Sequence, residues 1–160
     1  MTWTKSRWDS NRTGHLFAAA LAGAGLAVAN TFVYQDPILY VTAAAVPLWE
    51  WFGTPDMDHN SRRAKGGFFR IAWVLWWGRY AKVVGHRSPL SHSLTHGLPL
   101  RLWHGFWPLW MAVFVLIGTG YDLRDFWPYL EAAIAGCVIA DVIHMLKDGF
   151  NPAEIIRGKA

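Results

Sequence analysis

Histidines and carboxylates gather in two parts of this sequence in patterns that could bind a metal ion. The segment 54–96 opens with PDMDH at residues 55–59 and closes with HRSPLSHS at residues 86–93. Near the C-terminus, Asp141, His144 and Asp148 have the i,i+3 and i,i+4 spacings that share one helix face. Neutral imidazoles and carboxylates bind zinc, and also manganese or iron. These patterns indicate a site for one or more divalent ions, most simply zinc.

The composition places these residues in a membrane protein. Of the 160 residues, 53% are hydrophobic and only 16% are charged, and there are 11 tryptophans. A chain of this length is expected to form a single domain, here a membrane domain over residues 1–160. The single cysteine, Cys137, lies in an apolar run and cannot form an internal disulfide.

Four apolar runs predict the helices that would position the candidate ligands. Their approximate spans are 16–33, 37–52, 98–119 and 127–146, which predicts an all-α integral membrane bundle of about four transmembrane helices. A cleaved secretory signal is the alternative interpretation of the first run. Pro108 is expected to kink the third span, and Glu50 in the second could lie at the site or reach toward water.

The central segment contains a further apolar helix that is too short to span. Residues 68–80, FFRIAWVLWWGRY, lie between glycines and are apolar nearly all round. We expect an interfacial or re-entrant helix in this loop. Its Trp73, Trp76 and Trp77 could contact lipid or a partner membrane protein, because tryptophan is favoured at both kinds of boundary.

Four crossings would put both termini and the segment 54–96 on one side of the membrane. All 15 Lys and Arg residues lie with that side except Arg124, which falls in the loop before the last span. The positive-inside rule makes that side cytoplasmic. The rule also accounts for the net charge of +4, so the charge gives no reason to expect a nucleic-acid partner.

The same topology brings many ionisable side chains to the cytoplasmic face. Taken singly, His15 could be a solvated helix-start residue, Asp56 and Asp58 could cap a turn, and Asp148 could end a helix. Ionisable groups are costly to keep near a membrane without partners, so their accumulation favours a functional site.

The motifs resemble those of a bacterial family of proposed metal-binding membrane proteins. The resemblance rests on residues 55–59, Ser61-Arg62, residues 86–93, and His144 with Asp148. More distantly, the pattern is similar to YdjM-type inner-membrane metal-dependent hydrolases, which carry PDxDH, HRGxTHS and a late HxxxD. Those enzymes are similar in turn to the zinc phospholipase C and single-strand nuclease superfamily. Ser88, Pro89 and Ser91 depart from the hydrolase motif.

The resemblance implies roles for particular residues. Asp58 would be a ligand or the base that takes the water proton. Apart from the resemblance, Arg87, Arg62 and Arg63 could hold phosphate oxygens, because guanidinium matches them with two parallel hydrogen bonds. The implied metal ligands are His15, Asp56, His59, His86, His92, His144 and Asp148.

Two functions follow as expectations. The first is a zinc-type hydrolase acting on a phosphoester or lipid-like substrate at the cytoplasmic membrane face. The alternative is a non-catalytic membrane subunit, in which a metal or a polar cluster holds the bundle together and the tryptophan-rich surface packs in a larger assembly. An open coordination position would support the enzyme, and a closed one the subunit.

Overall fold

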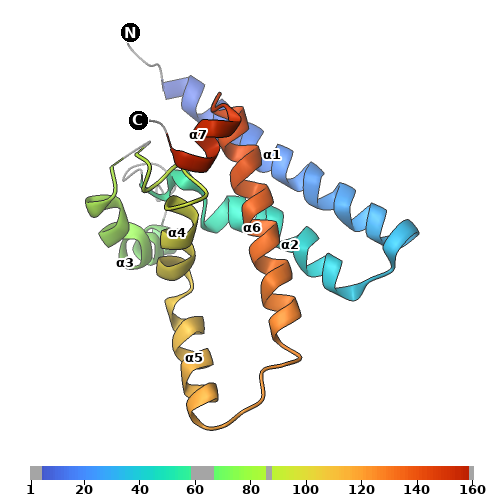
Figure 1. The fold of residues 1–160 in the computed structure, drawn as a ribbon. Helices are drawn as coiled ribbons and strands as arrows, with labels where there is room; N and C mark the ends of the chain where they lie inside the picture. Colours follow the sequence, from blue (N-terminus) through green and yellow to red (C-terminus); the bar gives the residue numbers. More distant parts are fainter. Residues whose placement is uncertain (1–4, 59–66, 86–87, 159–160) are drawn as a thin grey trace. The chain divides into compact units, whose positions relative to one another are not determined.

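The computed structural model describes residues 5–58, 67–85 and 88–158, with side chains described within 13–57, 71, 74–85 and 88–158. These residues form helices and contain no strand, which confirms the all-α prediction for the part described (Figure 1). The elements in order are α1 (Lys5–Ala29), the π-helical turn η1 (Asn30–Tyr34), α2 (Pro37–Phe52), the short 3-10 helix η2 (Pro55–Asp58), α3 (Gly67–Val83), α4 (Gly97–Gly105), α5 (Trp107–Gly118), α6 (Trp127–Lys147) and α7 (Pro152–Arg157).

The chain divides into two compact units. The first unit comprises Met1–Phe52 and Asp125–Asp148, and therefore contains α1, α2 and α6. The second unit comprises Gly53–Arg124 and Gly149–Ala160, and contains η2, α3, α4, α5 and α7. Each of the two sequence patterns that predicted metal ligands has described members in a different unit: His144 and Asp148 in the first, Asp56 and His92 in the second.

A short polar turn reverses the chain between α1 and α2. The buried Asn30 side chain donates to Asp36 O at 2.7 Å and accepts from Asp36 N at 3.0 Å. Gln35 adopts a left-handed backbone with φ of 54°, and Pro37 then begins α2. These bonds satisfy backbone groups that the helix ends leave open. Thr31 Oγ1 lies 2.9 Å from the Tyr40 hydroxyl and Gly23 lies against Ala43, so residue numbers run in opposite directions and the two helices are antiparallel.

Helix α2 packs between α1 and α6 through small residues. On the α1 side, a Cβ placed on Gly23 would lie 2.6 Å from Ala43 O, and on the α6 side a Cβ on Gly136 would lie 2.5 Å from Ala45 Cβ. Thr42 Oγ1 also donates to Ala132 O at 3.0 Å. Such close approach through glycine is typical of helix packing in membranes, where apolar burial alone drives little association.

The Gly136 contact predicts a position-dependent effect of one methyl group. We expect Gly136→Ala to destabilise the first unit by about 1–3 kcal/mol, because the added Cβ would press on Ala45 and on Thr42 O. Gly25→Ala is the matched control: no atom lies within 4 Å of its Cβ position, so higher helix propensity should leave stability unchanged or slightly raised. Unfolding of both variants in detergent measures the difference. Equal stabilities would contradict this close packing.

Contacts along α2 and α6 show that the two helices run parallel. Thr42 lies against Ala132 and Trp49 against Asp141, so both residue numbers increase together. Because α1 is antiparallel to α2, the apolar part of α1 begins at the end of the first unit where α2 and α6 finish. The predicted meeting of these helix ends is therefore present within the first unit.

Two helices are long and apolar enough to cross a membrane, Thr13–Tyr34 and Trp127–Lys147. A third crossing is possible if α4 and α5 form one broken span, although the two helices are bent by 72°. Helix α2 matches the predicted bounds 37–52, but its 16 residues extend only about 24 Å, less than the roughly 30 Å hydrocarbon core. The described chain thus has two or three candidate spans where the sequence predicted four.

The bend between α4 and α5 lies close to the predicted kink. The break is at Phe106, and Pro108 lies in the first turn of α5, where its missing N–H costs no hydrogen bond. The proline therefore starts a new helix instead of distorting a continuous one.

Helix α3 corresponds to the apolar helix predicted over 68–80. Trp76 Nε1 donates to Gly105 O at 3.0 Å, and His104 Nε2 lies 2.5 Å from Trp76 O, so the α3 backbone and side chain both contact α4. On other positions of α3, Ile71 and Leu75 are exposed. An outward apolar face of this kind is compatible with the predicted interfacial position.

The C-terminal segment after α6, for which the sequence predicted no helix, folds into α7. Asn151 accepts from Glu154 N at 3.0 Å, and Glu154 Oε2 accepts from Asn151 N at 2.8 Å, which completes a capping box. Leu94 N then donates to Ile155 O at 2.9 Å. Helix α7 therefore fastens the loop that carries His92.

Candidate metal centre

Four ionisable side chains meet where the three helices of the first unit come together. His15 comes from α1, Glu50 from the last turn of α2, His144 from the last turn of α6, and Asp148 caps that helix. His15 is 3% exposed, Glu50 2% and His144 1%. We call these four residues the buried cluster. Glu50, His144 and Asp148 lie at the ends of their helices, and His15 lies within α1 where its apolar part begins, so the parallel and antiparallel packing described above brings the four together.

Contacts within the buried cluster alternate between imidazole and carboxylate. His144 Nδ1 lies 3.1 Å and 3.2 Å from the two oxygens of Glu50. His144 Nε2 lies 3.6 Å from Asp148 Oδ2, and His15 Nε2 lies 3.3 Å from Asp148 Oδ1. The two imidazole rings are tilted by 40° to each other, with centroids 4.3 Å apart. His144 is therefore at the centre, with a carboxylate at each nitrogen.

The charges of the buried cluster require two positive equivalents. Glu50 and Asp148 are acceptors when ionised, and each lies beside at least one imidazole of the cluster. Buried carboxylates are costly unless they are paired or coordinate a cation. Two protonated imidazoles would balance them, and so would one divalent ion with both imidazoles neutral. The first arrangement would be a polar staple, the second a metal site.

The separations at Asp148 are compatible with the metal arrangement. Ligand atoms about 2.0–2.1 Å from a tetrahedral zinc ion lie about 3.3–3.4 Å from one another. His15 Nε2 lies 3.3 Å from Asp148 Oδ1 and His144 Nε2 lies 3.6 Å from the other oxygen, Oδ2; both distances are longer than the roughly 2.7–2.9 Å of a charge-assisted hydrogen bond. The donor set of two imidazoles and one carboxylate also suits zinc.

Glu50 is suited to orient one of the ligands. A metal-bound histidine usually donates its other N–H to a carboxylate, which fixes the ring and its tautomer. Glu50 is placed to accept from His144 Nδ1, leaving Nε2 directed toward Asp148. His15, Glu50 and His144 also each offer one ligand atom within 4.8 Å of the others, so Glu50 could bind an ion directly.

A second feature of His15 agrees with an ion or water at the cluster. Its Nδ1 is buried and makes no hydrogen bond within the described residues. A buried polar atom of this kind is ordinarily satisfied by an ion or an ordered water. The prediction that His15 starts a helix was wrong, because α1 begins at Lys5 and His15 lies inside it.

Asp141 shares the α6 face of His144 in the sequence pattern but contacts a tryptophan of α2. Its Oδ1 accepts from Trp49 Nε1 at 2.9 Å, and both side chains are buried. This bond joins α2 to α6 one turn from the buried cluster. Trp49 and Glu50, adjacent in the sequence, thus both contact acidic or basic groups of α6.

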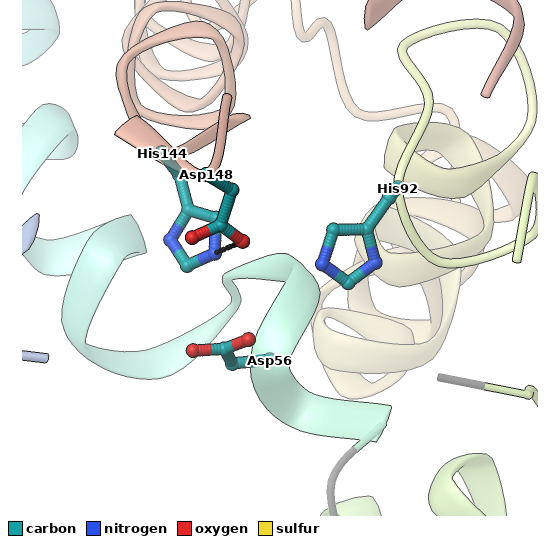
Figure 2. A group of neighbouring side chains, drawn as sticks. All are labelled: Asp56, His92, His144 and Asp148. Carbon is teal, nitrogen blue, oxygen red and sulfur yellow. Dashed lines mark ion pairs between the residues drawn. The ribbon is translucent and has the colours of Figure 1, made fainter. Parts of the chain in front are cut away.

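The second unit carries a smaller candidate group, which we call the Asp56–His92 pair. Asp56 lies in η2 and His92 in the loop before α4, and a carboxylate oxygen and a ring nitrogen come within 4.8 Å of each other. Figure 2 shows this pair and, in the first unit, His144 and Asp148 joined by their ion pair at the end of α6. Each unit therefore contains its own imidazole and carboxylate.

The environment of His92 holds its ring in place. His92 is fully buried, and its ring stacks on Phe150 with centroids 5.6 Å apart and an interplanar angle of 13°. Ser91 Oγ lies 2.8 Å from His92 Nδ1. The guanidinium of Arg101, also fully buried, donates to Ser91 O and so supports the same loop.

Several predicted site residues lie outside the described part of the chain. His59, His86 and Arg87 belong to segments that are not described, and the side chain of Asp58 is not described although its backbone closes η2. Their roles as ligands, base or phosphate contact stay predictions.

The tryptophans of α3 differ in how far their side chains are exposed to solvent. Trp77 is 1% exposed and packs edge-on to Tyr80, whereas Trp76 is partly exposed and stacks on Trp107. The Trp73 side chain lies outside the described residues. Trp77 thus packs inside the second unit, and of the two described tryptophans only Trp76 offers surface to a partner.

Comparisons with known proteins add no relative: no protein-family model, curated protein or solved structure matches the chain.

Proposed function

We propose that this protein is an integral membrane protein that binds a divalent transition metal ion, most simply zinc, in the buried cluster of its first unit. His15, His144 and Asp148 would be the ligands, and Glu50 would orient His144. The observation that supports this most strongly is the alternation of two imidazoles and two carboxylates, all nearly inaccessible to solvent, at ligand-like separations. We extend the proposal to the Asp56–His92 pair, which offers the same donor types in the second unit.

We further propose that the bound ion serves metal-dependent hydrolysis of a phosphoester, with a lipid-like substrate at the membrane face. Three protein ligands leave a fourth tetrahedral position, which is the arrangement of catalytic zinc sites. A bound zinc ion would supply a water that ionises near neutral pH. In the second unit, Asp58 would take the proton of such a water at an ion bound by the Asp56–His92 pair, as the motif resemblance implies. Arg87, also in the second unit, would hold phosphate oxygens through parallel hydrogen bonds.

The proposed orientation puts both termini and the metal ligands on the cytoplasmic side of a bacterial-type inner membrane. The distribution of Lys and Arg supports this orientation, because Arg124, in the loop between α5 and α6, is the single basic residue on the other side. The antiparallel order of α1 and α2 agrees with this orientation. The buried cluster lies at the end of the first unit where basic residues, Arg12 and Lys147, stand near His15 and Asp148 in the sequence.

Single-cysteine labelling tests this orientation. In a Cys137→Ala background, we expect Asp122→Cys to react with a membrane-impermeant maleimide in intact cells, because the exposed loop before α6 faces outward. Ala153→Cys on the exposed part of α7 should react only after the cells are permeabilised. The reverse pattern would contradict the proposed orientation.

A non-catalytic role is favoured by one specific observation, the burial of the cluster. The side chains of His15, Glu50, His144 and Asp148 are between 1% and 8% exposed, and together they join all three helices of the first unit. A metal or a doubly protonated staple at this position would stabilise the bundle without any reaction.

Hydrolysis assays on the metal-loaded protein distinguish these two roles. We expect the zinc-loaded protein, in detergent or in proteoliposomes, to hydrolyse a chromogenic phosphodiester, and Asp148→Asn to lose this activity together with its metal. Glu131→Gln changes an exposed carboxylate on α6 and should retain both. If the protein binds metal but hydrolyses neither water-soluble nor phospholipid phosphodiesters, the hydrolase proposal is wrong and the non-catalytic structural role is supported.

A further inference from the structure

We infer that Ser91 is a positioning residue that fixes the tautomer of His92, protonated at Nδ1 and with its lone pair at Nε2. The inference rests on the proposed function, because the use of that lone pair would be to bind the metal ion proposed for the Asp56–His92 pair. It assigns a role to the serine that precedes the histidine in the HRSPLSHS motif.

The argument starts from the single proton of the Ser91 hydroxyl. Ser91 Oγ lies 3.1 Å from Ser88 O and 3.2 Å from Gly85 O, and it lies 2.8 Å from His92 Nδ1. Carbonyl oxygens only accept hydrogen bonds, so a close hydroxyl contact with them is favourable only when the hydroxyl donates. The imidazole nitrogen is the one neighbour that can be either donor or acceptor. The Ser91 proton therefore points to the carbonyls.

This assignment determines the state of His92. With its proton directed to a carbonyl, Ser91 Oγ presents a lone pair to His92 Nδ1, so Nδ1 must carry hydrogen. A neutral imidazole then has its remaining lone pair at Nε2, the form in which histidine binds a metal. If Ser91 instead donated to Nδ1, its oxygen would face two carbonyl oxygens at 3.1–3.2 Å without a proton between them.

The surroundings hold both partners in this geometry. Ser91 and His92 are each fully buried, so water does not compete for the bond between them. The His92 ring is stacked on Phe150, and the backbone of the loop is held by Arg101 at Ser91 O. Hydrogen bonds of this kind to metal-bound histidines fix ring orientation and change metal affinity by about 10- to 100-fold.

The chain contains a matched pair of residues four positions later. Thr95 Oγ1 lies 2.9 Å from His96 Nδ1 and donates to Ile156 O at 2.8 Å. The hydroxyl and imidazole therefore have the same relation as Ser91 and His92, but both residues are exposed and His96 belongs to neither candidate metal group. Thr95→Ala removes the same type of bond where no metal is proposed.

The first test measures the tautomer of His92 directly. The 15N chemical shifts of the histidine rings are recorded on metal-free wild-type protein with labelled histidines. The His92 signal is assigned by its absence from the spectrum of His92→Gln. We expect protonated Nδ1 and bare Nε2. The opposite tautomer would overturn the inference without reference to metal. If His92 has the expected tautomer but the protein binds no zinc, the proposed function is wrong. The role inferred for Ser91 in metal binding is then wrong as well.

The second test compares variants. We expect Ser91→Ala to mix the two tautomers of His92 and to weaken zinc binding at this pair by about 10- to 100-fold, while Ser91→Thr restores both because it keeps the hydroxyl. Thr95→Ala should leave zinc affinity unchanged. If Ser91→Ala retains both the wild-type shifts and the wild-type affinity, Ser91 does not position His92. If Ser91→Ala does not fold, the tautomer of His92 in the wild type and in Ser91→Thr still tests whether the Ser91 hydroxyl fixes it.

Discussion

Replacement of His144 by alanine should abolish metal binding at the buried cluster and lower the free energy of unfolding by about 3–5 kcal/mol. His144 contacts both carboxylates of the cluster, with Nδ1 3.1 Å from Glu50 and Nε2 3.6 Å from Asp148. His144→Ala would leave Glu50 buried without the imidazole that balances its charge. Removing one partner of a buried pair is costly because the other charge stays uncompensated.

Metal content and unfolding should be measured together on this variant in the same detergent. His96→Ala is the control, because it also removes an imidazole but from an exposed position. We expect it to keep both metal and stability. A His144→Ala protein with wild-type metal content would exclude this histidine as a ligand. A stable variant that has lost its metal would show that the metal, and not the charge pairing, is what His144 contributes.

Glu50→Gln should weaken zinc binding by about 10- to 100-fold without unfolding the protein. The amide oxygen can still accept from His144 Nδ1, so the ring keeps its orientation, but the negative charge that strengthens His144 as a ligand is removed. The loss should appear as a higher dissociation constant in a competition titration with a zinc chelator. Because the substitution preserves size, the thermal stability of the metal-free form should change less than in His144→Ala.

Glu131→Gln provides the matched comparison for Glu50→Gln. It makes the same chemical change on an exposed carboxylate of α6, away from the last turn that carries His144. We expect its zinc affinity to equal that of the wild type. Complete loss of zinc in Glu50→Gln would instead identify Glu50 as a direct ligand, in agreement with the 4.8 Å group that it forms with His15 and His144. Unchanged affinity would remove Glu50 from the site.

Much of the helical architecture could be predicted from local signals in the sequence. The second apolar run gave the bounds of α2, because Pro37 can begin a helix and Gly53 follows its end. Trp127-Pro128 and the polar residues after Lys147 likewise marked α6. The bend near Pro108 was also predictable, since proline disfavours continuation of the preceding helix.

Helix α7 and the shape of its loop were not predicted, although one signal was present. Asn151-Pro152-Ala153-Glu154 has the cap residue, the proline at the first helical position and the glutamate of a capping box. The segment is only 6 residues long and polar, so it gives no apolar periodicity. Its function in holding residues 94–95 depends on contacts far apart in the sequence.

The candidate site was predictable in its residue types but not in its pairings. His15, His144 and Asp148 could be named because each stands at the end of an apolar run. The role of Glu50 could not be settled, because it depends on the parallel register that places α2 beside α6, 94 positions away in sequence from His144. The register is set by Gly136 against Ala45 and by Thr42 against Ala132, contacts that periodicity alone does not reveal.

Elemental analysis of the purified, zinc-reconstituted protein, combined with X-ray absorption at the metal edge, tests the central claim most directly. The account predicts at least one zinc ion per chain, bound by nitrogen and oxygen with imidazole scattering and without sulfur, and a lower content in the His15→Ala and Asp148→Asn variants. A chain that retains no metal after reconstitution, or wild-type metal content in both variants, would contradict it. The buried cluster would then be a staple of protonated histidines and carboxylates.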